Sequence, residues 1–182
     1  MKKTDNIYAP PKSALNIEKR GDGLISDLEW KSTWWLLFLA IITLGIYIAH
    51  YAKRQSAVIN SYSESDKLLK VRYVTIIMLT SYLAVILLFP SIYFEVTKQY
   101  EYVNLFDSID KFLTLFYSVY LVIWSFEARS RVHQMLSIEK GDAKWMNGFL
   151  TFFFTAYYVN YKINIINKSR TNKDAGPDVS VE

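Results

Sequence analysis

Hydrophobic residues in this chain are gathered into four long segments that contain no charged residue. No Asp, Glu, Lys or Arg lies in residues 32–52, 73–94, 112–126 or 145–161, which are runs of 21, 22, 15 and 17 residues. A helix needs about 17–25 apolar residues to cross a bilayer core, and a soluble helix of that length would show a charged stripe every three or four residues. The pattern therefore predicts an all-α integral membrane protein with about four hydrophobic helices in one small bundle.

The domain boundaries follow from the same pattern. We expect a polar, flexible N-terminal tail over residues 1–31, which holds a Pro-Pro pair and a Gly-Asp-Gly turn, and a disordered C-terminal tail over residues 168–182. Between the tails we predict one transmembrane helical domain, residues 32–167. Its four segments are residues 32–52, 73–94, 112–128 and 145–167.

Aromatic and basic residues mark the ends of these segments. Trp and Tyr favour the boundary between lipid and water, and the long side chains of Lys and Arg reach the headgroups from there. The first segment opens with tryptophans and runs through a glycine into two tyrosines and two bases, and the fourth opens with a tryptophan and closes with tyrosines. The candidate membrane-interface and helix-exit residues are Trp34, Trp35, Gly45, Tyr47, Tyr51, Lys53, Arg54, Trp145, Tyr157 and Tyr161.

Gly45 allows two interpretations of the first segment. A glycine lets a second helix approach closely, or it ends the helix so that the residues after it emerge as an amphipathic helix on the membrane surface. In the second case four apolar residues form a stripe beside Lys53 and Arg54. The stripe consists of Tyr47, Tyr51, Val58 and Tyr62.

The connectors between the segments differ in charge. The central connector, residues 95–111, holds only Lys98 and Lys111 beside four acids, whereas Lys and Arg are frequent in the other connectors and in both tails. Four full crossings divide the bases almost equally between the two sides, so the positive-inside rule decides nothing. If only the second and third segments cross, and the first and fourth are re-entrant or interfacial, 19 of the 21 bases share one side. Both arrangements stay open, because re-entrant backbone must be buried in protein or line a wet cavity.

The first and fourth segments show a weak likeness to each other. A shift of 110 residues pairs aromatic residues of the two segments: Trp35 with Trp145, Tyr47 with Tyr157, and Tyr51 with Tyr161. Internal repeats are common in membrane folds, but interface tryptophans and tyrosines recur in any membrane helix. We therefore prefer chance recurrence and keep an internal repeat as the alternative.

Two stretches of the chain resemble a known family. They read "WWLLFLAIITLGIYIAHYAKRQSAVIN" and "FFFTAYYVNYKINIIN", and they are similar to the bacterial membrane-protein family filed as domain of unknown function 4234. The resemblance covers residues 35–60 and 145–167, and it departs from the family pattern at His50-Tyr51, where the family has Tyr-Trp. It implies a multi-pass protein of the bacterial inner membrane and carries no activity or catalytic residue with it.

Little in the sequence points to chemistry. There is no cysteine, and the motifs of zinc proteases, P-loops and serine hydrolases are missing. His50 and His133 lie near segment ends, where we expect hydrated interfacial histidines rather than a zinc site. The bases border apolar runs, so the net charge of +4 favours anionic lipid over nucleic acid. We predict no enzymatic activity, no catalytic residue, no cofactor and no metal.

The predicted function is that of a non-catalytic scaffold, regulator or accessory subunit. Its partners are the lipid bilayer and either another membrane protein or a second copy of the chain. A transporter or channel subunit is one alternative, supported by the repeat and by hydroxyl groups in the second and third segments, although we expect those hydroxyls to bond across packed helices. An immunity-type protein that acts against a membrane-active toxin is another.

Overall fold

The computed structural model describes residues 21, 23–28, 31–63 and 68–174. All regular elements in these ranges are helices, so the predicted all-α class is confirmed. The bundle of four membrane helices is not confirmed, because the first and fourth segments are interrupted. The helices are α2 (Thr33–Ile42), α3 (Ile46–Tyr62), α4 (Val71–Val96), α5 (Tyr100–Met135) and α6 (Gly148–Asp174).

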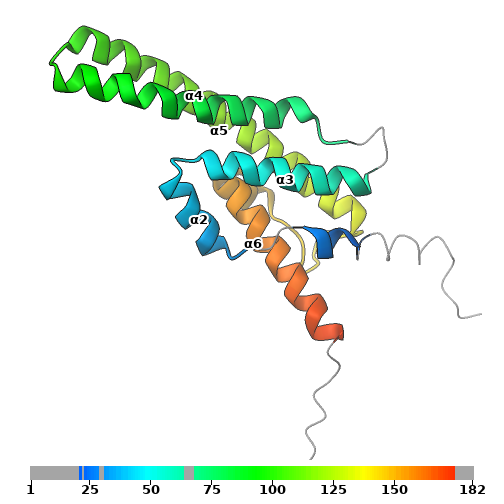
Figure 1. The fold of residues 1–182 in the computed structure, drawn as a ribbon. Helices are drawn as coiled ribbons and strands as arrows, with labels where there is room; N and C mark the ends of the chain where they lie inside the picture. The colour runs from blue at the N-terminus through cyan, green and yellow to red at the C-terminus, as the bar shows by residue number, and fades with distance from the viewer. Residues whose placement is uncertain (1–20, 22, 29–30, 64–67, 175–182) are drawn as a thin grey trace, which may run out of the picture.

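Helices α4 and α5 form an antiparallel hairpin that projects from the rest of the molecule (Figure 1). With 26 and 36 residues they extend about 39 and 54 Å at 1.5 Å per residue. At the tip of the hairpin the rings of Phe94 and Tyr102 stack with centroids 4.9 Å apart. Both helices are long and apolar enough to cross a membrane, and no other helix within the described ranges is.

The first predicted segment is two helices joined by a reversal. α2 ends at Ile42, and the backbone has φ of 51° at Leu44 and 88° at Gly45 before α3 begins. The N–H of Gly45 donates to the carbonyl of Ala40 over 2.7 Å, which closes a Schellman turn. This confirms that the glycine ends a helix. The ten residues of α2 extend only about 15 Å, half of a bilayer core.

The fourth predicted segment is broken in the same way. Thr155, with φ of 42° and ψ of −123°, interrupts α6 and leaves a short apolar helix before it and a longer one after it. The shift of 110 residues that aligns the two segments places Thr155 on Gly45. Both segments therefore consist of a short apolar helix, a residue with positive φ and a longer helix. This coincidence favours the internal repeat over the chance recurrence that we preferred from the sequence.

The hydrophobic core lies at the base of the hairpin, where α3, the end of α5 and the part of α6 after Thr155 pack together; we call this region the base. Residues 23–27 are helical, and Leu24, Ile25 and Leu28 are buried in the core, so this part of the predicted tail packs against the base. α6 continues to Asp174, beyond the predicted domain end at residue 167. Residues 1–20 and 175–182 of the predicted tails lie outside the described residues. The other buried side chains of the base include Tyr51, Ile59, Trp124, Ala128, Val132 and Ile163.

Candidate membrane interface

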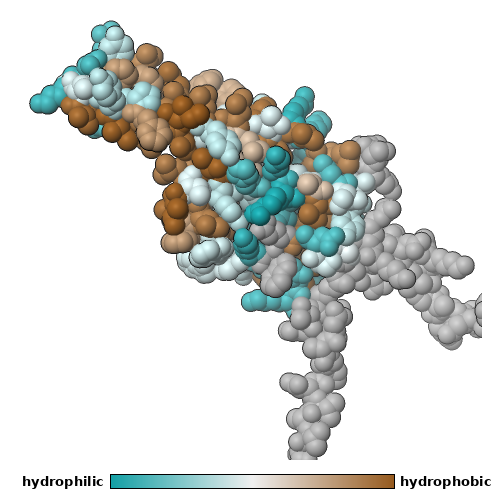
Figure 2. All heavy atoms as spheres, viewed as in Figure 1, coloured by the Kyte–Doolittle hydropathy of each residue, from teal (hydrophilic) through white to brown (hydrophobic). Residues whose placement is uncertain are grey.

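Large apolar side chains cover much of the surface outside the base. Figure 2 shows them along the shaft of the hairpin, with polar atoms gathered at its tip. On α4 the exposed residues include Leu79, Ile86, Phe89 and Ile92, and on α2 they include Trp34, Phe38, Ile41 and Ile42. The short helix at the start of α6 exposes Phe149, Phe152, Phe153 and Phe154. Apolar patches of this extent mark surfaces that contact a membrane or another protein.

Three of the predicted interface aromatics lie on this exposed surface. Trp34 and Trp35 stand near the start of α2, and Tyr161 stands on α6. Trp34 is 81% exposed, and the ring of Trp35 stacks on Phe38 with centroids 5.4 Å apart. That these aromatics lie at a membrane interface stays a prediction.

The predicted bases Lys53 and Arg54 lie on the exposed face of α3. Arg54 donates from Nη2 to the hydroxyl of Tyr47 over 3.0 Å, and its guanidinium lies 5.6 Å from the Tyr47 ring centroid. The ammonium of Lys31 lies 6.0 Å from the same ring. Two cations therefore contact one aromatic ring just after the Gly45 turn, a typical cation–π arrangement.

The apolar stripe of α3 faces the protein rather than a membrane surface. Tyr51 is only 2% exposed, and its ring meets the edge of Trp124 with centroids 6.2 Å apart. Trp124 in turn donates from Nε1 to Ser56 Oγ over 2.7 Å. Tyr47, Val58, Tyr62 and Tyr157 are partly buried against the same core. Tyr51 therefore packs in the protein core, and its place at a membrane interface stays a prediction, since hydrophobicity alone does not separate a core-facing stripe from a lipid-facing one.

Trp145 and His133 also have contacts within the protein. His133 Nε2 accepts the N–H of Met146 over 3.0 Å, and Arg129 Nε donates to the Met146 carbonyl over 2.6 Å. The rings of His133 and Trp145 stack with centroids 4.4 Å apart. Burial, together with the charges of Arg129 and Lys162, lowers the pKa of His133 to about 4. His133 is thus a neutral hydrogen-bond acceptor that ties the connector before α6 to α5.

The hydroxyl groups of α4 and α5 follow the expected bonding across packed helices only in part. The Tyr117 hydroxyl donates to the Gly45 carbonyl over 3.4 Å, whereas several threonine and serine hydroxyls donate to a carbonyl about one turn earlier in their own helix. The pairs are Thr75 with Val71, Thr80 with Ile76, Ser81 with Met78, Ser118 with Thr114, and Ser125 with Leu121. A cross-helix bond does join His50 Nε2 of α3 to the Tyr82 hydroxyl of α4 over 2.7 Å.

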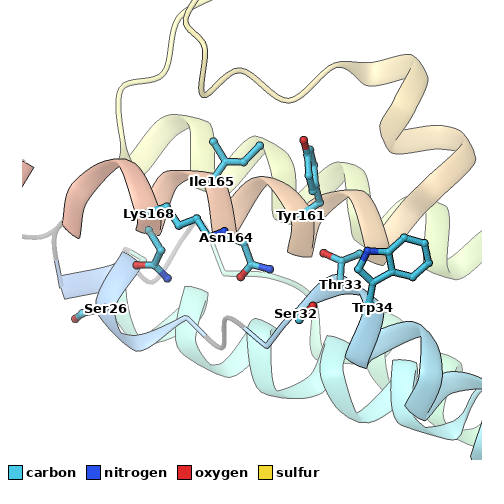
Figure 3. A pocket seen from close by; sticks show the side chains of 9 residues that line it. Ser26, Ser32, Thr33, Trp34, Tyr161, Asn164, Ile165 and Lys168 are labelled. Carbon is cyan, nitrogen blue, oxygen red and sulfur yellow. The ribbon is translucent and has the colours of Figure 1, made fainter. Parts of the chain in front are cut away.

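A cavity of about 590 Å³ opens between the start of α2 and α6. Asn160 Nδ2 holds the chain just before α2 by donating to the Lys31 carbonyl over 2.8 Å and to Thr33 Oγ1 over 3.2 Å. Asn164 Nδ2 donates to the same Lys31 carbonyl over 3.1 Å. Described residues lining the cavity are Ser26, Ser32, Thr33, Trp34, Tyr161, Asn164, Ile165, Asn167 and Lys168 (Figure 3).

Sequence reasoning missed this cavity, although the chain contained a signal for it. Asn160, Asn164 and Asn167 recur at spacings of four and three, which places three amides on one face of an otherwise apolar helix. Asparagine is rarely buried without a hydrogen-bond partner, so such a row predicts a polar contact. What the sequence could not supply was the element on the other side, because the start of α2 lies more than 120 residues earlier in the chain.

The described residues offer groups for binding lipid and polar ligands. They contain no group of three or more His, Asp or Glu residues that could hold a metal ion. Comparison with known proteins adds no assignment: no family model, no curated protein and no solved structure matches this chain. The class that the fold defines is an all-α protein with an apolar two-helix hairpin on a packed helical base.

Proposed function

We propose that this chain is an integral protein of the bacterial inner membrane and that it acts as a non-catalytic scaffold, regulator or accessory subunit. In this proposal the α4–α5 hairpin crosses the bilayer, the tip of the hairpin lies on one side of the membrane, and the base lies on the other. One observation carries the proposal: the hairpin shaft exposes side chains such as Ile86 and Phe89, which are 61% and 70% exposed. Apolar surface of this kind requires lipid or protein around it.

In this proposal, α2 and the part of α6 before Thr155 lie at the membrane interface. α2 and the part of α6 before Thr155 expose apolar faces and are too short to cross a bilayer. The turns after them lead each chain segment back to the base. These helices would therefore enter one leaflet from the basic side, which is the two-crossing arrangement that the sequence left open.

The distribution of charge supports the same arrangement. Only Lys98 and Lys111 of the 21 Lys and Arg residues lie in residues 95–111, at the tip of the hairpin. The other bases among the described residues lie in the base. By the positive-inside rule, the base faces the cytoplasm.

The outer surface of α5 favours a binding role. It carries two parallel stripes at helical spacing, one apolar and one polar, and every member is exposed. Where this polar stripe continues into the bilayer, at Thr114 and Ser118, it is more stable against a partner helix than against lipid. The apolar stripe is Leu105, Ile109, Phe112, Phe116, Val119 and Ile123, and the polar stripe is Asn104, Asp107, Lys111, Thr114 and Ser118.

Single cysteines can test this proposal cleanly, because the chain contains none. Three variants, Ser61→Cys, Lys98→Cys and Ser169→Cys, are labelled with a maleimide that cannot cross the membrane, first in intact cells and then after permeabilisation. We expect Lys98→Cys to react in intact cells, and Ser61→Cys and Ser169→Cys to react only after permeabilisation. If Ser169→Cys reacts from the same side as Lys98→Cys, the chain crosses four times and the proposed arrangement is wrong.

Two further single-cysteine variants test the binding role. Ser118→Cys on the polar stripe and Val119→Cys on the apolar stripe are adjacent, so they share one depth and differ only in the face they occupy. In native membranes we expect a thiol crosslinker to join the protein to a partner from Ser118→Cys and to give no defined product from Val119→Cys. Equal products from both positions, or none from either, would contradict a partner on the polar stripe.

A further inference from the structure

The cavity between α2 and α6 has an aromatic end and a basic end. Figure 3 shows Trp34 and Tyr161 at one end and Ser26 and Lys168 at the other, with Asn164 between them. Its volume of about 590 Å³ lies within the range of sites for small molecules. The cavity therefore combines a polar recess with a neighbouring apolar surface.

The polar lining is rich in hydrogen-bond donors. Within the described part of the chain, Ser32 Oγ, the Tyr161 hydroxyl and Lys168 Nζ are bonded to no other group, and the described lining includes no carboxylate. One ammonium and two hydroxyls can donate several hydrogen bonds to an anion. A phosphate group, with its charge and its acceptor oxygens, is the matching ligand chemistry.

One acceptor in the lining also lacks a partner. Asn164 Oδ1 is buried and accepts no hydrogen bond, although the other end of its amide donates to the Lys31 carbonyl. Asn160, which is not among the lining residues, is fully buried, and its Oδ1 is unpartnered as well. Buried carbonyl oxygens without a donor are costly, so the site favours a ligand that also carries a hydroxyl or an amine.

An apolar track leads away from the aromatic end. Trp34, Phe38 and Ile41 recur at spacings of four and three, so they share one face of α2, and all three are exposed. An acyl chain can lie along this face while a headgroup occupies the cavity. An anionic amphiphile matches all three features: its acyl chain can contact the apolar face of α2, its anionic group can accept from the hydrogen-bond donors of the cavity, and a hydroxyl or amine can donate to Asn164 Oδ1.

We propose that this cavity binds the headgroup of an anionic phospholipid that bears hydroxyl groups, as phosphatidylglycerol does. Lys168 neutralises the phosphate, a headgroup hydroxyl donates to Asn164 Oδ1, and an acyl chain follows Trp34, Phe38 and Ile41 along α2. The proposal rests on the proposed insertion of the hairpin into a membrane, which places the start of α2 at the headgroup level.

The test uses the full chain in a mild uncharged detergent and short-chain dihexanoyl-phosphatidylglycerol as the probe, with binding followed by calorimetry. We expect saturable binding that weakens about tenfold in Lys168→Gln, because a charge-assisted hydrogen bond contributes roughly 1.5 kcal/mol or more. Lys140→Gln is the matched control. It removes the same charge from an exposed position outside the cavity and is expected to change affinity less than about twofold.

Two further arms identify the source of the phosphate. Dihexanoyl-phosphatidylcholine, which carries no donor for Asn164, is expected to bind at least tenfold more weakly. Inorganic phosphate alone is expected not to compete. Equal losses in both lysine variants, equal binding of the two lipids, or competition by inorganic phosphate would each overturn the proposal. Cysteine labelling of Lys98→Cys in the Lys168→Gln background shows separately whether the hairpin is still inserted.

Discussion

Helix α5 passes through two different surroundings along its length. In the shaft of the hairpin, Phe112 and Leu115 are 59% and 61% exposed, whereas in the base Trp124 and Val132 are almost completely buried. The residue types are similar, and the helix is continuous across both parts. What differs is the neighbouring helices: α3 and α6 cover the base, whereas α4 is the partner of the shaft among the described helices. Similar apolar side chains thus serve a protein core in one region and an outward-facing surface in the other.

This difference separates two contributions to stability. A side chain in the base loses packing partners and leaves a cavity when it is truncated, while a side chain on the shaft only changes the surface that faces lipid or detergent. The free energy of unfolding should therefore respond to truncation in the base and hardly at all on the shaft. Membrane insertion should depend on the shaft instead.

Trp124→Ala is expected to have the largest effect. Trp124 packs against Tyr51, and its indole donates to Ser56 over 2.7 Å, so truncation removes a large buried ring and a buried hydrogen bond. We expect a loss of about 3–5 kcal/mol in the free energy of unfolding. Denaturant unfolding in detergent micelles, followed by circular dichroism, measures this loss.

Phe89→Ala is the matched change on the shaft. Phe89 is an aromatic residue of comparable size on α4 and is exposed. We expect its truncation to change the free energy of unfolding by less than about 1 kcal/mol in the same detergent. If both variants lost the same amount, the shaft would be packed against protein, and the distinction between the two regions would not hold.

The two helix breaks allow a smaller and sharper comparison. Gly45 has φ of 88°, and a Cβ at this position would meet only the Tyr117 hydroxyl at 3.8 Å, so Gly45→Ala is expected to cost about 1 kcal/mol through backbone strain alone. Thr155 adopts φ of 42° and ψ of −123°, which a glycine tolerates better, so Thr155→Gly is expected to stabilise the fold by about 1 kcal/mol. The same unfolding measurement checks both. If Gly45→Ala lowers the free energy of unfolding and Thr155→Gly raises it, the two turns are equivalent. If Thr155→Gly lowers the free energy of unfolding, the threonine side chain is needed at this turn.

The sequence predicted the hydrophobic segments well and their environments poorly. Charge-free runs identified α4 and the middle of α5, because a long apolar helix has a period and composition that no loop shares. The breaks at Gly45 and Thr155 were harder to predict, since glycine has several roles and a threonine gives no signal for positive φ. The burial of Tyr51 depends on Trp124 of α5, which is remote in the chain. The same holds for the α2–α6 cavity, whose two sides are more than 120 residues apart.

His133 gives the smallest expected effect, and it is confined to the base. In the folded protein its pKa is lowered from the ordinary 6.5 to about 4, because burial and the charges of Arg129 and Lys162 disfavour the imidazolium. The unfolded chain therefore binds a proton at higher pH than the folded chain does, so the contribution of His133 is complete above pH 6.5 and declines as the pH falls toward 4. We expect the free energy of unfolding to decrease modestly between pH 7 and pH 4.5. His133→Gln retains an acceptor for the Met146 N–H without a titrating group, so it should show a smaller decrease over this range. An identical pH dependence in the two proteins would assign the decrease to other groups.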